Sequence, residues 1–428
     1  MSRRAAGTPP WRDPAGTPSW RDPVGTPSWR DAAETPPWRD PAVVAFAAAV
    51  VLGVGQALAA ALGRGGFGVT PTTIVAGTVP YAAALGVLLV VRAGRDAPRW
   101  RHDLDVWLVG LAVFGSLLAT WLLVRFAVSL PQAVGAEFGF YRLKGRITSP
   151  LGDHNTAAGL LLPPLVATAV LAASRPRWAW AGGVVALGLV ATLSRGVAAV
   201  LAIVVVAAFV LASRVRVAVV LTAAFGVVVL GLTAAMVGLD TSVPPGTAAP
   251  GPATQAGAGP LGASVLGRID LAVRGVGAGA DRPLTGVGLG GFASVAQDLP
   301  QPNDHAHQAF ANAFAEGGVP LLLAVLVVVV TLAVRAARLP RSPRRDLVLL
   351  GGLGLVAHAQ LEILAGRLGH EVLLAALVGL AVVPGTSRAR AGQASGTAGG
   401  PAPGTGGGRA PETGGGPAPG TGGRPASG

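Results

Sequence analysis

Residues 321–334, "LLLAVLVVVVTLAV", contain no charged side chain. Apolar runs of about 17 residues or more recur along the chain, and runs of that length are typical of transmembrane helices. The chain has 428 residues, of which 51% are hydrophobic and 12% charged, whereas about a quarter of the residues in soluble domains are charged. The sequence therefore predicts an all-α fold, that of a polytopic helical membrane protein.

The apolar runs predict about ten membrane spans. We expect residues 42–386 to form one transmembrane domain with a single large loop at 240–318. The first apolar run starts only near Ala42, which predicts an uncleaved first span rather than a cleavable signal peptide. The predicted spans lie near 42–62, 74–91, 104–130, 154–173, 178–193, 196–213, 217–239, 319–335, 347–366 and 370–385.

Both ends of the chain have low complexity. Residues 1–41 repeat a nine-residue unit four times, as in "GTPSWRDPV", and residues 387–428 are rich in Gly and Pro. Proline at this density disfavours helices and sheets, and the second tail lacks apolar content, so we expect both tails to be disordered spacers. The Trp-Arg pairs of the repeats would also suit an anionic membrane surface.

Arginine clusters between the spans predict the orientation, because cytoplasmic loops carry an excess of Lys and Arg. With the N-terminus inside, four clusters fall on cytoplasmic loops; they begin at Arg92, Arg175, Arg214 and Arg335. The prediction is a multi-pass protein of the cytoplasmic (inner) membrane, with both termini in the cytoplasm and the large loop outside. This distribution accounts for the net charge of +13 without a nucleic-acid partner. The absence of cysteine excludes disulfides and thiolate metal sites.

Three arginines on the predicted outer side are candidates for holding phosphate, since the guanidinium fork binds phosphate oxygens through paired hydrogen bonds. Arg146 precedes a helix start that Asn155 and Thr156 would cap. Arg195 lies in "LSRG", a very short joint between two apolar spans, and Arg268 precedes "LAVRGV", which suggests a short interfacial helix. The alternatives are a basic loop near lipid headgroups for Arg146 and snorkelling to the interface for Arg195.

A glycine-rich stretch, "TGVGLGGF" at residues 285–292, follows on the same loop. It lacks the Gly-Lys-Ser/Thr ending of a phosphate loop, and no strand–helix context surrounds it. The sequence therefore predicts a flexible turn here rather than a nucleotide site.

Ionisable residues gather at residues 301–320, "QPNDHAHQAFANAFAEGGVP", directly before the apolar run quoted first. Asp304, His305 and His307 have a spacing that suits a metal ion, but no second pair of ligands with such spacing exists, so we expect no metal. On a helix beginning near Asp304, His307 would share a face with Phe310. Histidine titrates near neutral pH, so we favour a general base, His307 first and His305 second. The alternative is an interfacial histidine without a role.

Taken in order over roughly residues 42–385, these pieces resemble the O-antigen ligase and polymerase superfamily of membrane glycosyltransferases. Gln308 stands where that family has an asparagine after the histidine, and twelve spans are common in it, which leaves twelve as the alternative to ten. The residues that carry the resemblance are Arg146 with Asn155; Thr192, Ser194, Arg195 and Gly196; Arg268 ahead of Pro283, Gly286, Gly288 and Phe292; and His307 with Glu316, Gly318 and Pro320.

The resemblance implies an enzyme that needs neither a metal nor another cofactor. Such proteins take a glycan from a polyprenyl-diphosphate carrier and transfer it to an acceptor at the outer face of the cytoplasmic membrane, in cell-surface polysaccharide assembly. The implied partners are the lipid-linked donor, a glycan or lipid-glycan acceptor, and membrane lipids. The implied site comprises His307 and His305 as catalytic residues, Arg146, Arg195 and Arg268 for the diphosphate, and Asn155 and Glu316 in support.

Two functions from other classes remain open at this point. A transporter or flippase for a lipid-linked or anionic substrate would also carry ionisable residues within its membrane part, and a non-catalytic membrane scaffold would need none. The charges gather at one predicted face, and no repeat is visible within the membrane part, which favours the enzyme. The sequence does not separate a ligase, which transfers one glycan, from a polymerase.

Overall fold

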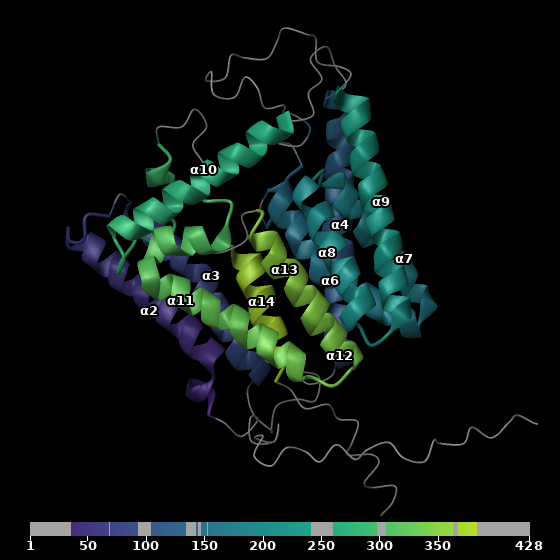
Figure 1. Ribbon diagram of the computed structural model, residues 1–428, viewed down its shortest axis with the longest axis horizontal. Coiled ribbons are helices and arrows are strands. Elements are labelled where there is room, and N and C mark those ends of the chain that lie inside the picture. Colours follow the sequence, from purple (N-terminus) through teal and green to yellow (C-terminus); the bar gives the residue numbers. More distant parts are fainter. Residues whose placement is uncertain are drawn as a thin grey trace, which may run out of the picture. The chain divides into compact units, whose positions relative to one another are not determined.

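The computed structural model describes residues 36–67, 69–92, 104–133, 143, 147–151, 153–240, 260–297, 305–362 and 367–382, which all belong to one compact unit. Helices account for 82% of the structure, and the described residues contain no strand (Figure 1). The predicted all-α fold is therefore confirmed.

Each of the ten predicted apolar segments overlaps a helix. Six helices in the described part are long and apolar enough to cross a membrane, and they begin at Pro41, Pro71, Leu104, His154, Val215 and Ala309. The count of ten spans stays a prediction. The helices are α2 (Pro41–Ala61), α3 (Pro71–Arg92), α4 (Leu104–Ala133), α6 (His154–Ser174), α7 (Ala179–Ala191), α8 (Arg195–Leu211), α9 (Val215–Asp240), α10 (Pro260–Asp281), α11 (Ala309–Arg338), α12 (Pro343–Asp346), α13 (Gly352–Ala359) and α14 (Leu368–Leu380), with a π-helical turn at Leu347–Gly351 between α12 and α13.

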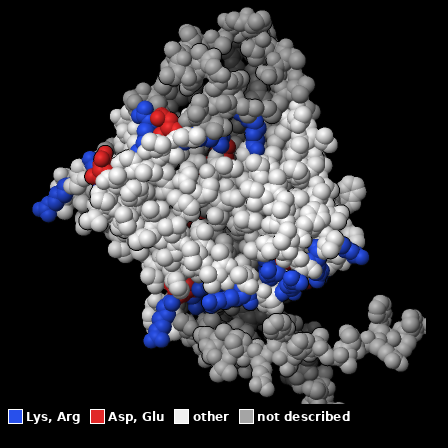
Figure 2. Space-filling view, in the orientation of Figure 1, with Lys and Arg blue, Asp and Glu red and all other residues white. Residues whose placement is uncertain are grey.

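Helix α6 lies at the centre of the bundle. Its most apolar window is 89% buried, whereas those of the other five long helices are 28–44% buried. The outward faces of those helices carry large apolar side chains, such as Val51, Leu117 and Leu230. On the face shown in Figure 2, charged side chains gather near the two ends, and few lie in the belt between them. An apolar belt of this kind is what a helical bundle presents to lipid, so this is a membrane protein.

Helix α10 belongs to the loop predicted at 240–318, and it lies across one end of the bundle (Figure 1). The sequence suggested only a short helix after Arg268, but α10 has 22 residues. It can pack closely on the start of α11 because a Cβ at Gly279 would meet the backbone oxygen of Phe314 at 2.7 Å. The opposite face of α10 exposes Ile269 and Val273. The helix therefore brings Arg268 over the end of the bundle where α11 begins.

The glycine-rich turn at 285–292 is buried between α2, α3 and α11. Gln56 of α2 binds two points of this turn: it accepts from the N–H of Leu289 at 3.0 Å and donates to the oxygen of Thr285 at 2.6 Å. Gly286 has a φ of 59° and packs against the backbone of α11, where no side chain would fit. The flexible turn predicted from the glycines is therefore wrong: the turn is anchored and braces the first part of α11.

An ion-pair network joins four helices at the end of the bundle opposite His307. Asp40 caps α2, with the N–H of Ala42 donating to its Oδ1 at 2.9 Å. The same carboxylate pairs with Arg92 at the end of α3 and with Arg335 of α11, whose Nη2 lies 2.8 Å from Oδ1. Arg335 also donates to the oxygen of Val378 in α14. Asp40 belongs to the fourth tail repeat, so the folded part begins within the repeats.

Replacing Asp40 with Asn is expected to destabilise the fold by about 3–5 kcal/mol, because it leaves two buried guanidinium groups without their carboxylate. Asparagine still caps a helix. The loss of stability therefore measures the ion pairs of Asp40 and not its role as the helix cap. Thermal unfolding of the purified protein in detergent measures the effect. The control is Asp105→Asn, which breaks an exposed pair with Arg175 and should change stability by about 1 kcal/mol or less. Equal, small changes in both variants would contradict the assignment.

Candidate functional site

The joint between α7 and α8 places Arg195 at the first position of α8. Leu193 closes this joint with a φ of 53°, which is unusual for a residue with a side chain. Ser194 occupies the N-cap position and is fully buried. Within the described part of the chain, the structure gives Arg195 no ion-pair or hydrogen-bond partner. A helix N-terminus favours anions, and a guanidinium without a partner among the described residues can bind one. Arg195 is therefore suited to an anionic ligand.

Arg268 reaches from α10 to the turn that follows α13. Its Nη2 lies 2.6 Å from Oε1 of Glu362, and its Nη1 donates to the oxygen of Leu361 at 2.5 Å. Its side chain remains 31% exposed, and these two bonds use only two of its five N–H groups. Arg268 therefore ties α10 to the bundle and still offers donors to a ligand.

His307 lies just before α11 rather than on it. The helix begins at Ala309, where Gln308 accepts from the N–H of Ala311 and caps it, so the predicted helix start near Asp304 is wrong for His307. The backbone of His307 has a φ of 52°. Strained backbone of this kind clusters at functional sites. Asp304 itself lies outside the described residues.

The two histidines contact each other directly. Nε2 of His305 lies 3.1 Å from Nε2 of His307, and the rings meet edge to face with centroids 4.3 Å apart. His305 is buried, and the side chain of His307 is 15% exposed. The structure therefore brings both histidine candidates together in one contact pair.

Glu362 connects these pieces, and the sequence analysis missed it. Its Oε2 lies 3.6 Å from Nδ1 of His307, its Oε1 pairs with Arg268, and it packs so closely on Gly196 that a Cβ there would meet Oε1 at 3.1 Å. It is 2% exposed. Its carboxylate is held between the guanidinium of Arg268 and the ring of His307. The signal was a carboxylate inside the apolar segment 347–366, which marks function.

The remaining predicted residues are placed differently. Arg146 lies outside the described residues. Asn155 is buried in the first turn of α6, but it does not cap the helix: Asp153 does, through a 2.7 Å bond from the N–H of Thr156. The predicted cap is wrong because an aspartate two residues earlier already accepts that N–H group. The side-chain oxygen of Asn155 has no hydrogen-bond partner among the described residues.

Glu316 contacts both the glycine-rich turn and a residue that holds the histidine segment. Its carboxyl group lies against the backbone N–H groups of Gly290 and Phe292 and the side chain of Asn312. Asn312 in turn accepts from the N–H of Ala306, between the two histidines, at 3.1 Å. Glu316 therefore braces the glycine-rich turn and, through Asn312, the segment that carries His305 and His307.

Several buried polar atoms at this end have no hydrogen-bond partner within the described residues. They are Nδ1 of His307, Oε2 of Glu362, Oγ of Ser194, Oδ1 of Asn155 and both ring nitrogens of His358. Unpaired buried polar groups are rare in folded proteins, so their concentration indicates a place for water or a polar ligand. The described residues contain no group of three or more His, Cys, Asp or Glu side chains spaced to hold a metal ion.

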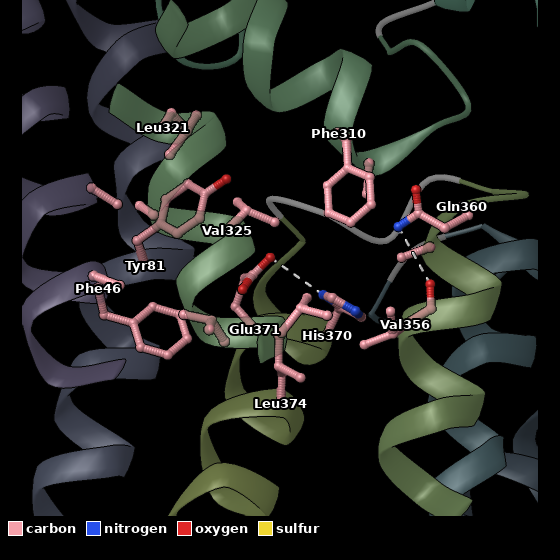
Figure 3. Close-up of a pocket in the computed structure, with 17 residues that line it drawn as sticks. Phe46, Tyr81, Phe310, Leu321, Val325, Val356, Gln360, His370, Glu371 and Leu374 are labelled. Atoms are coloured by element: carbon pink, nitrogen blue, oxygen red, sulfur yellow. Dashed lines mark hydrogen bonds and ion pairs between the residues drawn. The ribbon is translucent and has the colours of Figure 1, made fainter. Parts of the chain in front are cut away.

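A small apolar pocket lies between α2, α3, α11, α13 and α14. Figure 3 shows Phe46, Tyr81 and Phe310 among its lining, with His370 and Glu371 paired at its polar part. Gln360 also lines it, and donation from Gln308 to Gln360 at 2.7 Å links the pocket wall to the segment carrying His307. The pocket wall is therefore connected to the segment that carries the two histidines.

Residues 180–326 match a family model described as O-antigen ligase. No curated protein matches the chain. The matched segment contains Arg195, Arg268, His305, His307 and Glu316, and Glu362 lies beyond it. The match covers 147 of the 428 residues and supports, over that part of the chain, the resemblance to O-antigen ligases.

Proposed function

We propose that this protein transfers or polymerises a glycan from a polyprenyl-diphosphate carrier onto an acceptor at the outer face of the cytoplasmic membrane. The observation that carries the proposal is the meeting of Arg268, His307 and the Arg195 turn at one buried carboxylate, Glu362. These groups come from three separate parts of the chain. Such a transfer needs cations that stabilise the leaving diphosphate and a base that removes the acceptor proton, and this group of residues supplies both.

In the proposed reaction, the acceptor hydroxyl oxygen attacks the anomeric carbon of the donor glycan. The new C–O bond forms as the bond between that carbon and the diphosphate oxygen breaks, so polyprenyl diphosphate leaves with the electron pair. The hydroxyl proton passes to His307, directly or through His305, since an imidazole is a base near neutral pH. The reaction releases no phosphate and consumes no nucleotide.

Arg195 and Arg268 would bind the diphosphate. Negative charge grows on the leaving oxygen in the transition state, and fixed cations in a water-poor site stabilise it more strongly than they would in water. The guanidinium of Arg195 has no partner within the described residues, and Arg268 uses only two of its five N–H groups in its bonds to Leu361 and Glu362. Arg146, in a segment outside the described residues, stays a predicted third cation.

Reconstitution tests the proposal. The purified protein is placed in liposomes with a polyprenyl-diphosphate glycan and an acceptor, and product length is read by mass spectrometry. A single added glycan means a ligase, and a ladder of lengths means a polymerase. Movement of intact donor between leaflets without cleavage would instead establish a transporter and refute the proposal. The Asp346→Asn variant, altered at the opposite end of the bundle, serves as the control preparation and should behave as the unmodified protein does.

A further inference from the structure

We propose that Glu362 is a positioning residue, which holds the base His307 and the cation Arg268 in register with each other. This inference rests on the proposed glycan transfer and adds to it a residue outside the matched domain. Each carboxylate oxygen has a different partner. Oε1 pairs with Nη2 of Arg268 at 2.6 Å, and Oε2 lies 3.6 Å from Nδ1 of His307. A single side chain thus fixes the distance between the proton acceptor and the group that binds the leaving diphosphate.

The first effect of Glu362 is on the tautomer of His307. A carboxylate beside Nδ1 favours the neutral ring that carries its proton on Nδ1, which leaves the lone pair on Nε2. Nε2 is the atom that meets His305, so the lone pair is directed into the histidine pair. The same carboxylate stabilises the imidazolium that forms when the acceptor loses its proton. A carboxylate performs both tasks for the histidine of serine proteases.

The second effect is on Arg268. Its bonds to Glu362 and to the oxygen of Leu361 hold the guanidinium in one plane, so its remaining N–H groups have fixed directions before the donor arrives. An arginine fixed in advance loses less conformational entropy on binding than a mobile one. Glu362 also offsets part of the positive charge that would otherwise hold the diphosphate product.

Other charged groups face Glu362 and bear on any pH dependence. Arg268 comes from α10, His307 from the segment before α11, and His358 from α13. His370 and Asp153 face His358 in turn. Gly196, at the start of α8, contacts the carboxylate directly and leaves it room, since a larger residue there would press on Oε1. The test therefore replaces Glu362 alone and leaves these neighbouring groups unchanged.

The test compares Glu362→Gln, Glu362→Asp and Asp346→Asn in liposomes with a polyprenyl-diphosphate glycan and an acceptor. Asp346 is a matched control: it is a fully buried carboxylate held by Ser213. It lies at the other end of the same helical run, about 20 Å away at 1.5 Å per residue. Asp346→Asn should retain the unmodified kcat.

Glu362→Gln should lower kcat by about 10²–10⁴-fold, as expected when a neutral amide replaces the carboxylate that orients a catalytic histidine. The KM for the donor should stay level or fall, because Arg268 keeps its full charge. The acidic limb of the pH–rate profile should move to lower pH, because the imidazolium is no longer stabilised. Glu362→Asp keeps the charge and should recover part of kcat. An unchanged kcat and pH profile in Glu362→Gln would overturn the proposal.

A second measurement does not depend on turnover. ¹⁵N NMR of histidine-labelled protein reports the tautomer of His307, with the signal assigned by its loss in His307→Ala. The unmodified protein should show the proton on Nδ1, and Glu362→Gln should lose that preference. An unchanged tautomer would refute the positioning role even if transfer occurs. A protein that shows the tautomer effect but transfers no glycan would refute the proposed function and leave the positioning of His307 by Glu362 standing.

Discussion

The His307→Ala variant should lose glycan transfer by about 10²–10⁴-fold, which is the usual contribution of a general base. Within the described residues, the polar contacts of its ring are with His305 and Glu362. The helix that follows is capped by Gln308 and not by His307. Removing the imidazole should therefore stop proton transfer and leave the fold in place. The rate of product formation in liposomes measures the loss, and gel filtration in detergent confirms the fold.

His305→Ala is the informative companion of this variant. If His307 is the base and His305 only assists it, His305→Ala should reduce the rate by a smaller factor. A larger loss in His305→Ala than in His307→Ala would exchange the roles within the pair. Near-normal rates in both variants would contradict a histidine base at this site.

Arg195→Ala should lower kcat by about 10²–10³-fold, the cost of removing one donor that stabilises developing negative charge. Arg195 sits at the start of α8 and has no partner within the described residues, so no structural bond is lost. Arg195→Lys should recover only part of the rate, because an ammonium ion lacks the planar fork that matches phosphate. Donor turnover measured over a range of donor concentrations separates kcat from KM.

Arg274→Ala is the matched control for the arginines. It lies on α10 with the same 31% side-chain exposure as Arg268, but its partner is Asp270 one turn earlier. Such exposed pairs contribute little, so this variant should transfer glycan at nearly the unmodified rate. If Arg274→Ala and Arg195→Ala lose activity equally, the effect is one of general charge and not of a diphosphate site.

The six long apolar helices could be predicted from the sequence because each contains an apolar run of sufficient length to cross a membrane. Prediction failed where tertiary contacts decide the local structure. The glycine-rich turn looked flexible, but Gln56, far away in the sequence, anchors it. The start of α11 was placed too early, because Gln308 caps the helix and His307 takes a left-handed conformation that no local pattern signals.

The candidate site was predicted in part. Arg195, Arg268 and His307 were chosen as isolated ionisable groups in an apolar chain, and that scarcity is visible in sequence. Their meeting point was not, because Glu362 lies in a segment interpreted as a membrane span, and its three contacts come from residues 55 or more positions away in the sequence. A carboxylate in an apolar segment should have been counted as a functional candidate in its own right.

The most direct test of the account measures the lipid product. Purified protein in liposomes is given a polyprenyl-diphosphate glycan and an acceptor, and the lipid is analysed by mass spectrometry as glycan product accumulates. We predict that free polyprenyl diphosphate appears mole for mole with each new glycosidic bond, and that His307→Ala forms neither. Glycan transfer without release of the diphosphate, or undiminished release in His307→Ala, would contradict the account.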